Sequence, residues 1–372
     1  MKGVSVIGMG KLGLCFALNL DKVNYRVDGY DINKDYLASL KNKTFYSDEP
    51  GVNELLKNSK NLYLHNELKK IMHNNVIFVI VHTPSLPNGK YDHKHIESVK
   101  MDLISLGVQK TTKHLVINCT TFPGYCDELQ KDLKPYNYTV SYNPEFIAQG
   151  TILKDQVNAD TVLIGEANPT IGNVIENIYI DHCISNPRIC KMDRISAEIT
   201  KLSLNCFLTT KISFANMVGD ISNKVGGSTN KILEAIGSDS RIGGKYLMWG
   251  YGYGGPCFPR DNRALHIFAE ENGIDAQISK ATDKMNELHL TYQVEEFVRT
   301  NPDKDVPVVF DYVTYKPQST MLEESQQLKF ALSLQKLGYN VVVDERDSVI
   351  KELKESGLEF KNSINNLKMN NK

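Results

Sequence analysis

The chain has 372 residues, with 43 Lys or Arg and 44 Asp or Glu, so its formal net charge is −1. A near-neutral chain lacks the strong cationic surplus of nucleic-acid-binding proteins, and we expect no nucleic-acid partner. Hydrophobic residues make up 41% and charged residues 23%, an ordinary globular composition that excludes a disordered, collagenous or membrane-dominated chain. At about 100–200 residues per domain, two or three domains are predicted.

The first half of the chain alternates short apolar runs with longer amphipathic stretches. The predicted strands are residues 2–7, 26–32, 75–82, 114–120, 138–142 and 161–164. Segments long enough for a helix lie between most of them, for example residues 11–20 and 93–106. Repetition of strand and helix predicts a parallel sheet with helices on both faces, and we assign residues 1–190 to this first domain.

A long helical period follows, from residue 194 to residue 225, and no proline interrupts it. The positions at three-to-four spacing are Ile195, Ile199, Leu202, Cys206, Thr209 and Ser213. A helix of about 30 residues is longer than one small core needs, so we expect it to bridge domains or to form a dimer interface. Residues 191–300 are assigned to this central helical region.

A second alternation of strand and helix begins after Asn301-Pro302. It predicts a strand over residues 306–313, a helix over residues 323–337 and a strand over residues 340–344. The fold class is therefore α/β, with two Rossmann-like doubly wound domains joined by a long central helix. Residues 301–372 are assigned to the second of these domains.

Cellular location and metal content are read from the cysteines and the apolar runs. The longest apolar run, residues 76–81, is far too short to cross a bilayer, and we expect no membrane partner. Residues 1–8 indicate a strand that enters a glycine turn, not a signal peptide. Seven cysteines without a CxxC motif or a Cys/His cluster predict neither a disulfide framework nor a metal site. We expect a soluble cytoplasmic protein.

A dinucleotide-binding motif follows the first predicted strand, in the run Gly8-Met9-Gly10-Lys11-Leu12-Gly13. The first glycine of such a motif makes the tight turn, the second admits a pyrophosphate, and the third allows close packing of helix on strand. Asp31 ends the second predicted strand, where a carboxylate binds a ribose 2′-hydroxyl and repels a 2′-phosphate. The cofactor is therefore predicted to be NAD, although nearby Lys34 weakens the preference over NADP.

A glycine-dense loop leads to Cys257 in the run Gly250-Tyr251-Gly252-Tyr253-Gly254-Gly255-Pro256-Cys257. Backbone N–H groups of such a loop can stabilise a thiolate and a tetrahedral oxyanion. Asp261 follows four residues later, one helical turn away. A thiol can trap an aldehyde as a thiohemiacetal, which a second hydride transfer converts to a thioester, so NAD and a nucleophilic cysteine form a meaningful pair. The alternative is that Cys257 is a small core residue.

The chain resembles the UDP-glucose/GDP-mannose dehydrogenase family of nucleotide-sugar dehydrogenases from residue 1 to about residue 345. Besides the glycine motif with Asp31, the resemblance rests on runs that occur in the family's order. These are His82-Thr83-Pro84, Thr120-Thr121-Phe122-Pro123-Gly124, Asn143-Pro144-Glu145-Phe146-Ile147-Ala148-Gln149-Gly150-Thr151, Glu198-Ile199-Thr200-Lys201-Leu202-Ser203-Leu204-Asn205, Arg241-Ile242-Gly243 and the Cys257 loop.

The resemblance implies two NAD-dependent hydride transfers that oxidise a primary alcohol of the sugar to a carboxylate. Cys257 would be the nucleophile, and Lys201 and Asn205 would stabilise the oxyanion. Asp261 would position or activate water, with Glu145 and Thr121 assisting hydrolysis. Without the resemblance, Lys201 would be interpreted as a solvated helix lysine and Glu145 as a helix-capping carboxylate.

The resemblance also implies which residues bind the two small molecules. For NAD these are Gly8, Met9, Gly10, Lys11, Leu12, Gly13, Asp31, Thr83, Pro84 and Thr121. For the nucleotide sugar they are Phe146, Ile147, Ala148, Gln149, Lys201, Asn205, Arg241, Tyr246, Leu247, Gly254, Phe258 and Lys316. Arg241 would reach the substrate across a homodimer interface built on the central helix.

The chain departs from the family pattern at several positions. Many relatives carry a charged residue at one or both positions of Ala148 and Gln149, so water activation there would be weaker. In the nucleotide-binding region, Tyr312 replaces a glycine and Glu323 replaces an arginine. Glu323 would either repel a diphosphate or point to solvent as a helix N-terminal carboxylate. The segment after residue 347 is short by family standards, which implies a truncated C-terminal nucleotide-sugar-binding domain.

Several functions fit the sequence. The first is oxidation of UDP-glucose to UDP-glucuronate for polysaccharide biosynthesis, and the run Asn143-Pro144-Glu145-Phe146 favours UDP-glucose or GDP-mannose over an N-acetylhexosamine. The second is the same chemistry on GDP-mannose or a UDP-N-acetylhexosamine. The third, from a different class, is a non-catalytic protein that binds NAD or a nucleotide sugar, although such a protein needs no thiol nucleophile. A one-step hydroxyacid dehydrogenase likewise has no use for the cysteine.

Overall fold

The computed structural model describes residues 2–147, 150–317 and 319–360, and the chain divides into two compact units, Met1–Lys201 and Leu202–Lys372. The strands are β1 (Gly3–Ile7), β2 (Arg26–Tyr30), β3 (Leu62–His65), β4 (Val76–Val79), β5 (Lys113–Ile117), β6 (Tyr138–Tyr142), β7 (Thr161–Gly165), β8 (Arg188–Met192), β9 (Val308–Phe310) and β10 (Val341–Val343).

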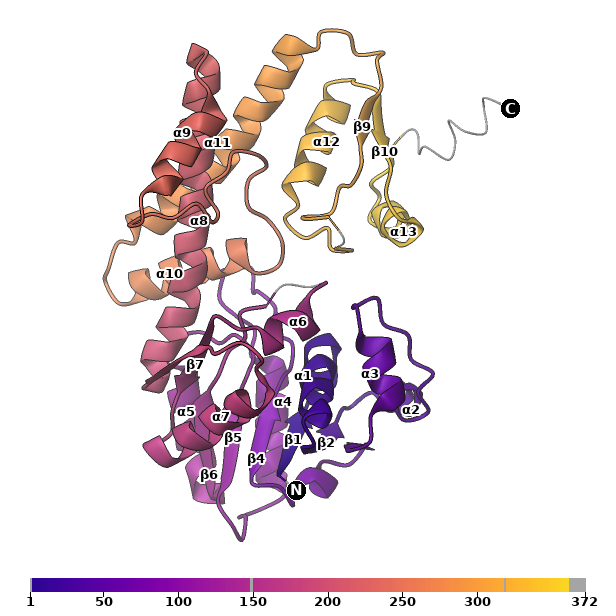
Figure 1. Cartoon of the computed structure of the whole chain (residues 1–372), viewed down its shortest axis with the longest axis vertical. Coiled ribbons are helices and arrows are strands. Elements are labelled where there is room, and N and C mark those ends of the chain that lie inside the picture. The colour runs from indigo at the N-terminus through magenta and orange to yellow at the C-terminus, as the bar shows by residue number, and fades with distance from the viewer. Residues whose placement is uncertain (1, 148–149, 318, 361–372) are drawn as a thin grey trace. The chain divides into compact units, whose positions relative to one another are not determined.

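Helices make up most of the remaining regular structure (Figure 1). They are α1 (Lys11–Lys22), α2 (Lys34–Lys41), α3 (Val52–Asn58), α4 (Lys94–Ser105), α5 (Tyr125–Leu133), α6 (Ile152–Val157), α7 (Pro169–His182), α8 (Arg194–Val225), α9 (Thr229–Ser238), α10 (Phe258–Glu271), α11 (Gln277–Thr300), α12 (Gln326–Lys336) and α13 (Asp347–Glu355). The 3-10 helices are η1 (Leu68–Ile71) and η2 (Lys134–Tyr136).

The sheet of the first unit has the strand order β3-β2-β1-β4-β5-β6-β7-β8. The chain starts in the middle of the sheet, extends it to one edge and then returns to extend it to the other, which is the doubly wound arrangement. The predicted fold class is confirmed. The sheet is not wholly parallel, because β7 pairs antiparallel with β6 at Tyr142 and Gly165. The segment between these strands stays on the carboxyl side of β6, so β7 runs back.

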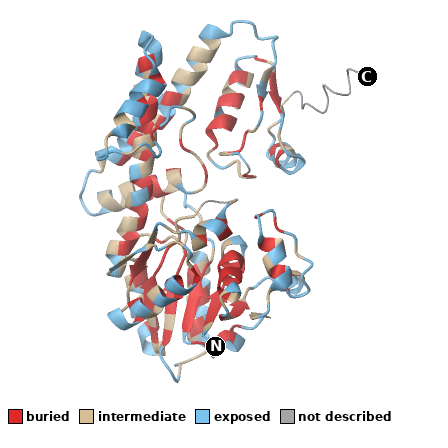
Figure 2. Ribbon diagram, viewed as in Figure 1, coloured by how far each residue is buried: buried red, intermediate tan, exposed pale blue. Residues whose placement is uncertain are grey.

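Helices pack on both faces of this sheet because side chains alternate along each strand. In β4, Val76 and Phe78 belong to the core formed with α1, α3, α6 and α7. Ile77 and Val79 belong to the opposite core, formed with α4 and α5. Figure 2 shows the result as buried strands between helices whose outer faces are exposed.

The sequence patterns missed two strands of this sheet, β3 and β8. Both lie at edges of the sheet, and both are only partly buried. An edge strand is defined by pairing with its one neighbour, which for β3 is β2 and for β8 is β7. Because this pairing joins segments that are distant in the sequence, the sequence of each edge strand shows no strong alternation of apolar residues.

The second unit contains most of α8, which has 32 residues and the bounds predicted from its period. β9 and β10 form a two-stranded parallel sheet. Phe310 of β9, Phe330 of α12 and Val349 of α13 share a small core with partly buried residues of α11. The observed strands of this second α/β region are shorter than predicted. Among the described residues, no helix combines the length and the hydrophobicity needed to span a membrane.

Candidate active site

The glycine motif forms a tight turn between β1 and α1. Gly8 has a φ of +93°, and a Cβ there would lie 2.2 Å from the carbonyl oxygen of Ile80. A Cβ on Gly13 would lie 1.9 Å from the carbonyl oxygen of Gly8. By contrast, a Cβ on Gly10 would meet nothing within 4 Å. Gly8 and Gly13 are therefore required by packing, whereas Gly10 leaves open space at the start of α1.

A cavity of about 300 Å3 adjoins this turn and is lined by Gly10, Asp31, Tyr36 and Val52 among others; we call it the cofactor cavity. Asp31 accepts hydrogen bonds from the backbone N–H groups of Met9 and Asn33, each at 2.9 Å. Its carboxylate is thus held at the end of β2. The Tyr36 hydroxyl donates to the Met9 carbonyl oxygen at 2.8 Å and closes the wall of the cavity.

This arrangement fits the predicted cofactor. The first turn of α1 contains no acidic side chain, so the positive end of the helix faces the open space at Gly10. A pyrophosphate can approach there, while the fixed Asp31 carboxylate suits a ribose 2′-hydroxyl. Exposed Lys11 and half-buried Leu12 begin the helix. Of the other predicted cofactor residues, Thr83 is buried and donates to the Thr120 carbonyl oxygen at 2.9 Å, and Pro84 is half-buried.

Thr121 is completely buried beside a carboxylate that the sequence reasoning missed. Its hydroxyl donates to Glu198 at 2.8 Å. Glu198 also accepts from the backbone N–H groups of Gly124 and Cys126, at 2.6 and 3.0 Å, where α5 begins. Burial raises the pKa of the Glu198 carboxyl, and the hydrogen bonds oppose this rise. The signal for Glu198 was a charged residue in the apolar period of the long helix, between Ile195 and Leu202.

Glu145, Lys201 and Tyr179 lie together in the first unit. The Lys201 ammonium donates to the backbone carbonyl of Glu145 at 2.8 Å and lies 4.5 Å from the ring centre of Phe146. The Tyr179 hydroxyl lies 3.2 Å from the Glu145 carboxylate and 2.7 Å from the side-chain oxygen of Asn143. Burial raises the pKa of Glu145 to about 7, against the opposing influence of the Tyr179 hydroxyl. A carboxyl group with this pKa can both accept and release a proton near neutral pH.

Cys257 and Asp261 lie one helical turn apart in the second unit. Cys257 is the N-cap residue of α10 and is exposed. The Asp261 backbone N–H donates to the Cys257 carbonyl oxygen at 2.8 Å. The Asp261 carboxylate is buried and accepts a hydrogen bond from the Asn205 amide at 2.7 Å. Because α8 also carries Lys201, one helix positions Asn205 and Lys201 four residues apart.

The glycines before Cys257 are in close contact with the segment that precedes α12. A Cβ on Gly254 would lie 2.3 Å from the carbonyl oxygen of Glu324, and one on Gly255 would lie 2.5 Å from the ring of Tyr315. The Gly255 backbone N–H donates to the Glu323 carbonyl oxygen at 3.1 Å. The loop that carries Cys257 therefore depends on glycine for its position.

The two replaced positions in this segment have defined surroundings. The Glu323 side chain is exposed. The neighbouring Glu324 carboxylate pairs with Arg263 at 2.7 Å and with Lys329 at 2.5 Å. Tyr312 is half-buried, and its hydroxyl accepts a hydrogen bond from Gln327 at 3.4 Å.

The remaining predicted substrate residues have different surroundings. Arg241 is exposed and pairs with Asp239 at 2.7 Å. Tyr246 is exposed with a φ of +62° and lies edge-on to Phe258, whereas Leu247 is buried beside Ala215 and Leu233. Lys316 lies 5.6 Å from the ring centre of Tyr315, and Ile147 packs on the core of the first unit. Ala148 and Gln149 lie outside the described residues.

Comparison with known protein families gives two matches. Residues 2–182 match the NAD-binding domain of the UDP-glucose/GDP-mannose dehydrogenase family, and residues 195–288 match the central domain of the same family. The chain is also 29% identical over 352 residues to UDP-glucose 6-dehydrogenase TuaD of Bacillus subtilis, an alignment that covers 92% of this chain and 75% of the relative.

Solved structures agree with these matches. A UDP-glucose dehydrogenase from Pyrobaculum islandicum is 28% identical with a TM-score of 0.84, covering 95% of this chain and 84% of its own. A UDP-D-ManNAc dehydrogenase from Pyrococcus horikoshii, 21% identical, shares the fold with a TM-score of 0.78, covering 94% of this chain and 86% of its own. The chain belongs to the UDP-glucose/GDP-mannose dehydrogenase family and is an NAD-dependent nucleotide-sugar dehydrogenase.

Proposed function

We propose that this enzyme oxidises the C6 alcohol of UDP-glucose to the carboxylate of UDP-glucuronate. Each of the two oxidations removes two electrons, and one water molecule supplies the second carboxylate oxygen. The glycine turn, Asp31, Thr83 and Pro84 would hold NAD, which would supply the hydride acceptor for both oxidations. The UDP-glucose 6-dehydrogenase of Bacillus subtilis described above supports this choice of substrate.

The observation that carries the proposal is the placement of Cys257 at the start of α10, exposed and one turn before a buried carboxylate. The positive end of the helix stabilises the thiolate. The thiolate adds to the aldehyde carbon formed in the first oxidation, and the new C–S bond holds the sugar as a thiohemiacetal. The second oxidation gives a thioester, and hydrolysis breaks the C–S bond and regenerates the thiol.

The residues on α8 stabilise charge in this scheme. Lys201 uses one N–H to bind the Glu145 carbonyl oxygen, and an ammonium has three such donors. Lys201 and Asn205 stabilise the oxygen that becomes negative in each addition step. Asn205 also holds the Asp261 carboxylate, which orients water for hydrolysis of the thioester. Glu145 takes a proton from this water, and Thr121 assists from its buried position.

The family resemblance supplies the residues that contact the sugar and the nucleotide in this proposal. They are Phe146, Ile147, Ala148, Gln149, Tyr246, Leu247, Gly254, Phe258, Lys316 and Arg241. The exposed side chain of Glu323 favours the solvent-facing alternative for this residue, which leaves UDP recognition possible. The second candidate substrate class is a UDP-N-acetylhexosamine, the class to which the substrate named for the Pyrococcus horikoshii enzyme belongs. GDP-mannose is the other alternative substrate.

The decisive experiment counts NADH and identifies the product. The enzyme is incubated with NAD and separately with UDP-glucose, UDP-galactose, UDP-N-acetylglucosamine and GDP-mannose. We expect two NADH per UDP-glucose, with uronate formed. Activity with another donor alone would retain the chemistry and overturn the proposed substrate. No activity with any donor, despite measurable NAD binding, would instead favour the non-catalytic function.

We also propose that the enzyme is a homodimer through α8. One face of the helix in the second unit exposes apolar side chains at heptad-like spacing, with Phe207 at 65% and Ile221 at 59% exposure. Leu204, Phe214 and Val225 lie on the same stripe. A matching stripe on a second copy would cover it. Light scattering should give twice the mass of the chain for the wild type and the mass of one chain for Phe214→Glu, whereas an unchanged mass would contradict this interface.

The seven thiols support activity in a reducing compartment, which we propose to be the cytoplasm. Cys15, Cys119, Cys126 and Cys206 are buried in the two units, and Cys183 and Cys190 are half-buried. Disulfides persist mainly in oxidising compartments, whereas the proposed chemistry needs Cys257 as a thiol. Activity that survives only with a reductant present would support this assignment.

A further inference from the structure

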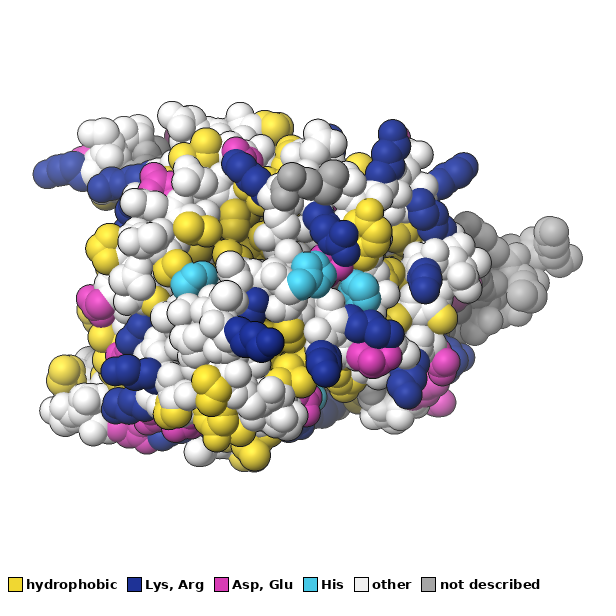
Figure 3. All heavy atoms as spheres, turned by 90° about the horizontal axis from the view of Figure 1, so that it is seen from below, with side chains coloured by type: hydrophobic (Ala, Val, Ile, Leu, Met, Phe, Trp, Pro, Cys, Tyr) yellow, Lys and Arg dark blue, Asp and Glu magenta, His cyan; other side chains and the backbone are white. Residues whose placement is uncertain are grey.

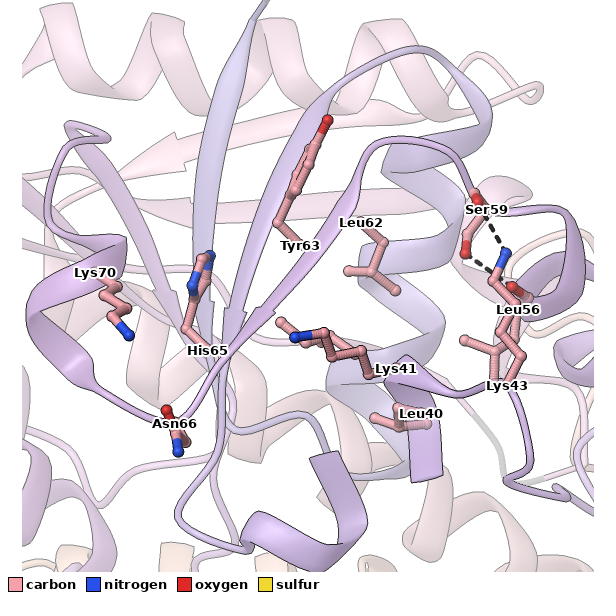
Figure 4. Close-up of a pocket in the computed structure, with 11 residues that line it drawn as sticks. Leu40, Lys41, Lys43, Leu56, Ser59, Leu62, Tyr63, His65, Asn66 and Lys70 are labelled. Atoms are coloured by element: carbon pink, nitrogen blue, oxygen red, sulfur yellow. Dashed lines mark hydrogen bonds between the residues drawn. The ribbon is translucent and has the colours of Figure 1, made fainter. Parts of the chain in front are cut away.

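A second cavity in the first unit lies beside the edge strand β3 (Figure 4). Its volume is about 360 Å3, in the lower part of the range of small-molecule sites. Four leucines form its apolar floor, with Leu40 and Leu56 buried and Leu62 and Leu64 half-buried on the strand. Its polar lining contains Lys41, Lys43 and Lys70, and no Asp or Glu is among the described residues that line it. We call it the lysine cavity.

The three lysines differ in what they bind. Lys43 donates to the carbonyl oxygens of Lys57 and Ser59 at 2.7 and 3.1 Å, so it shapes the wall. Lys70 pairs with Glu67 at 2.7 Å. Lys41 makes no hydrogen bond or ion pair with the described part of the chain, and Figure 4 shows its side chain extending toward β3 on the side of the strand where Leu62 lies. Lys41 is therefore the cation available to a ligand.

Two rings on β3, those of Tyr63 and His65, are held in place on the face of the strand opposite to the leucines and Lys41. The His65 ring nitrogen lies 2.9 Å from the carboxylate of Asp28, which is completely buried. The Arg26 guanidinium lies 4.3 Å from the centre of the Tyr63 ring, and this tyrosine is 41% exposed. These rings therefore form the rim of the cavity, across the edge strand from its leucine floor. On the face drawn in Figure 3, Lys and Arg side chains lie near the histidines, with Asp and Glu side chains among them.

The lysine cavity and the cofactor cavity contact the same two helices. Tyr36 in the first half of α2 lines the cofactor cavity, whereas Leu40 and Lys41 at its end line the lysine cavity. In α3, Val52 at the start lines the cofactor cavity and Leu56 one turn later lines the lysine cavity. The two cavities are therefore one helical turn apart along each of these helices.

We propose that the lysine cavity binds a small organic phosphate with an apolar or aromatic body, and that this binding strengthens NAD binding. The lysine charge and the absence of acidic lining select an anion, and a flexible ammonium is a common phosphate ligand. The leucine floor selects an apolar body. Ordering α2 and α3 once serves both ligands, so the second to bind pays a smaller entropic cost.

Phenyl phosphate is a suitable probe because it joins both features and lacks a nucleoside. Calorimetric titration into the full chain at saturating NAD should show binding, with inorganic phosphate binding more weakly. Lys41→Glu should weaken phenyl phosphate binding by about tenfold or more, because a charged hydrogen bond is lost and a like charge is added. The matched control is Lys131→Glu, an exposed lysine of α5 outside the cavity, which should bind phenyl phosphate as the wild type does.

Coupling is tested in both directions on the same proteins. Saturating phenyl phosphate should lower the Kd of NAD by about fivefold, and NAD should lower the Kd of phenyl phosphate by the same factor, because such coupling is reciprocal. Lys41→Glu should lose this effect and retain the NAD affinity of the wild type without phosphate. Absence of binding, or equal binding by Lys41→Glu, would overturn the site. Binding without a change in NAD affinity would overturn the coupling, and aggregation of Lys41→Glu with unchanged binding would mean that Lys41 only protects the edge strand.

Discussion

The two units hold their site residues by different means. In the first unit, carboxylates are fixed by several hydrogen bonds around an eight-stranded sheet, as with Asp28 and Glu198. In the second unit, the loop of Cys257 is fixed by contact of Gly254 and Gly255 with a neighbouring segment, beside a sheet of only two strands. The first unit is therefore sensitive to loss of charge or of a hydroxyl, whereas the second is sensitive to added volume.

Cys257→Ser should have the largest effect, and this effect should be confined to the second unit. The hydroxyl is a much weaker nucleophile than the thiolate, so we expect uronate formation to fall by about 1,000-fold or more. NAD binding by the first unit should be unchanged. The measurements are uronate by chromatography and NAD affinity by fluorescence titration. Full uronate formation by this variant would overturn the covalent mechanism.

The dependence of the second unit on small side chains is tested with Gly254→Ala. The new Cβ would lie 2.3 Å from the Glu324 carbonyl oxygen, so the loop must move. A shift of about 1 Å at a reacting group can cost about 100-fold in rate, and we expect a loss of that order in kcat/KM. Gly250→Ala is the matched control, since its Cβ would meet nothing within 4 Å. Equal activity of the two variants would show that the glycine contact does not position Cys257.

The features that the sequence predicted best are those that depend on a short local segment of the chain. The glycine motif specifies its own turn, and the predicted role of Gly13 in close packing agrees with the 1.9 Å approach of its Cβ to Gly8. The bounds of α8 follow from its period alone. Asp261 lies one turn after Cys257 because four residues of helix make that turn.

The features that could not be predicted depend on contacts between distant residues. Glu198 binds Thr121, which is 77 residues away, and Tyr179 meets Glu145 across 34 residues. No local pattern encodes such pairs, because each partner alone resembles an ordinary helix or loop residue. The edge strand β3 was missed for the same reason, since only its pairing with β2 defines it.

A moderate effect is expected when a buried charge is removed from the first unit. Burial alone would raise the pKa of Asp28, but hydrogen bonds from Arg26, His65 and Asn74 outweigh it and hold the pKa at about 2, below the usual 3.8. The ionised form therefore adds stability above pH 3.8, and this stability is lost as the pH falls from 3.8 toward 2. Its contribution at neutral pH is about 2 kcal/mol.

Asp28→Asn should thus lower the free energy of unfolding by about 2 kcal/mol at pH 7, with a difference that shrinks below pH 4. Urea unfolding of the variant and the wild type across this pH range measures the difference. Asp48→Asn, which changes an exposed carboxylate of the same unit, is the matched control and should have little effect. A difference that stays constant down to pH 2 would show that Asp28 stabilises the fold by shape and not by charge.

The smallest effect should come from the Tyr179 hydroxyl, which acts through Glu145. Burial raises the pKa of Glu145 to about 7 from the usual 4.5, and the Tyr179 hydroxyl opposes the rise. Ionisation of Glu145 therefore lowers stability as the pH rises through 7, while it supplies the proposed base.

Tyr179→Phe removes a donor that stabilises the Glu145 carboxylate, so the pKa of Glu145 rises. The acidic limb of the kcat/KM profile should therefore move to higher pH by about 0.5–1 pH unit. Tyr138→Phe is the control, because among the described residues its buried hydroxyl has no hydrogen-bond partner. A loss of rate without a shift of the profile would mean that Tyr179 is structural, whereas a shift confined to Tyr179→Phe would link the first unit's hydrogen bonds directly to water activation.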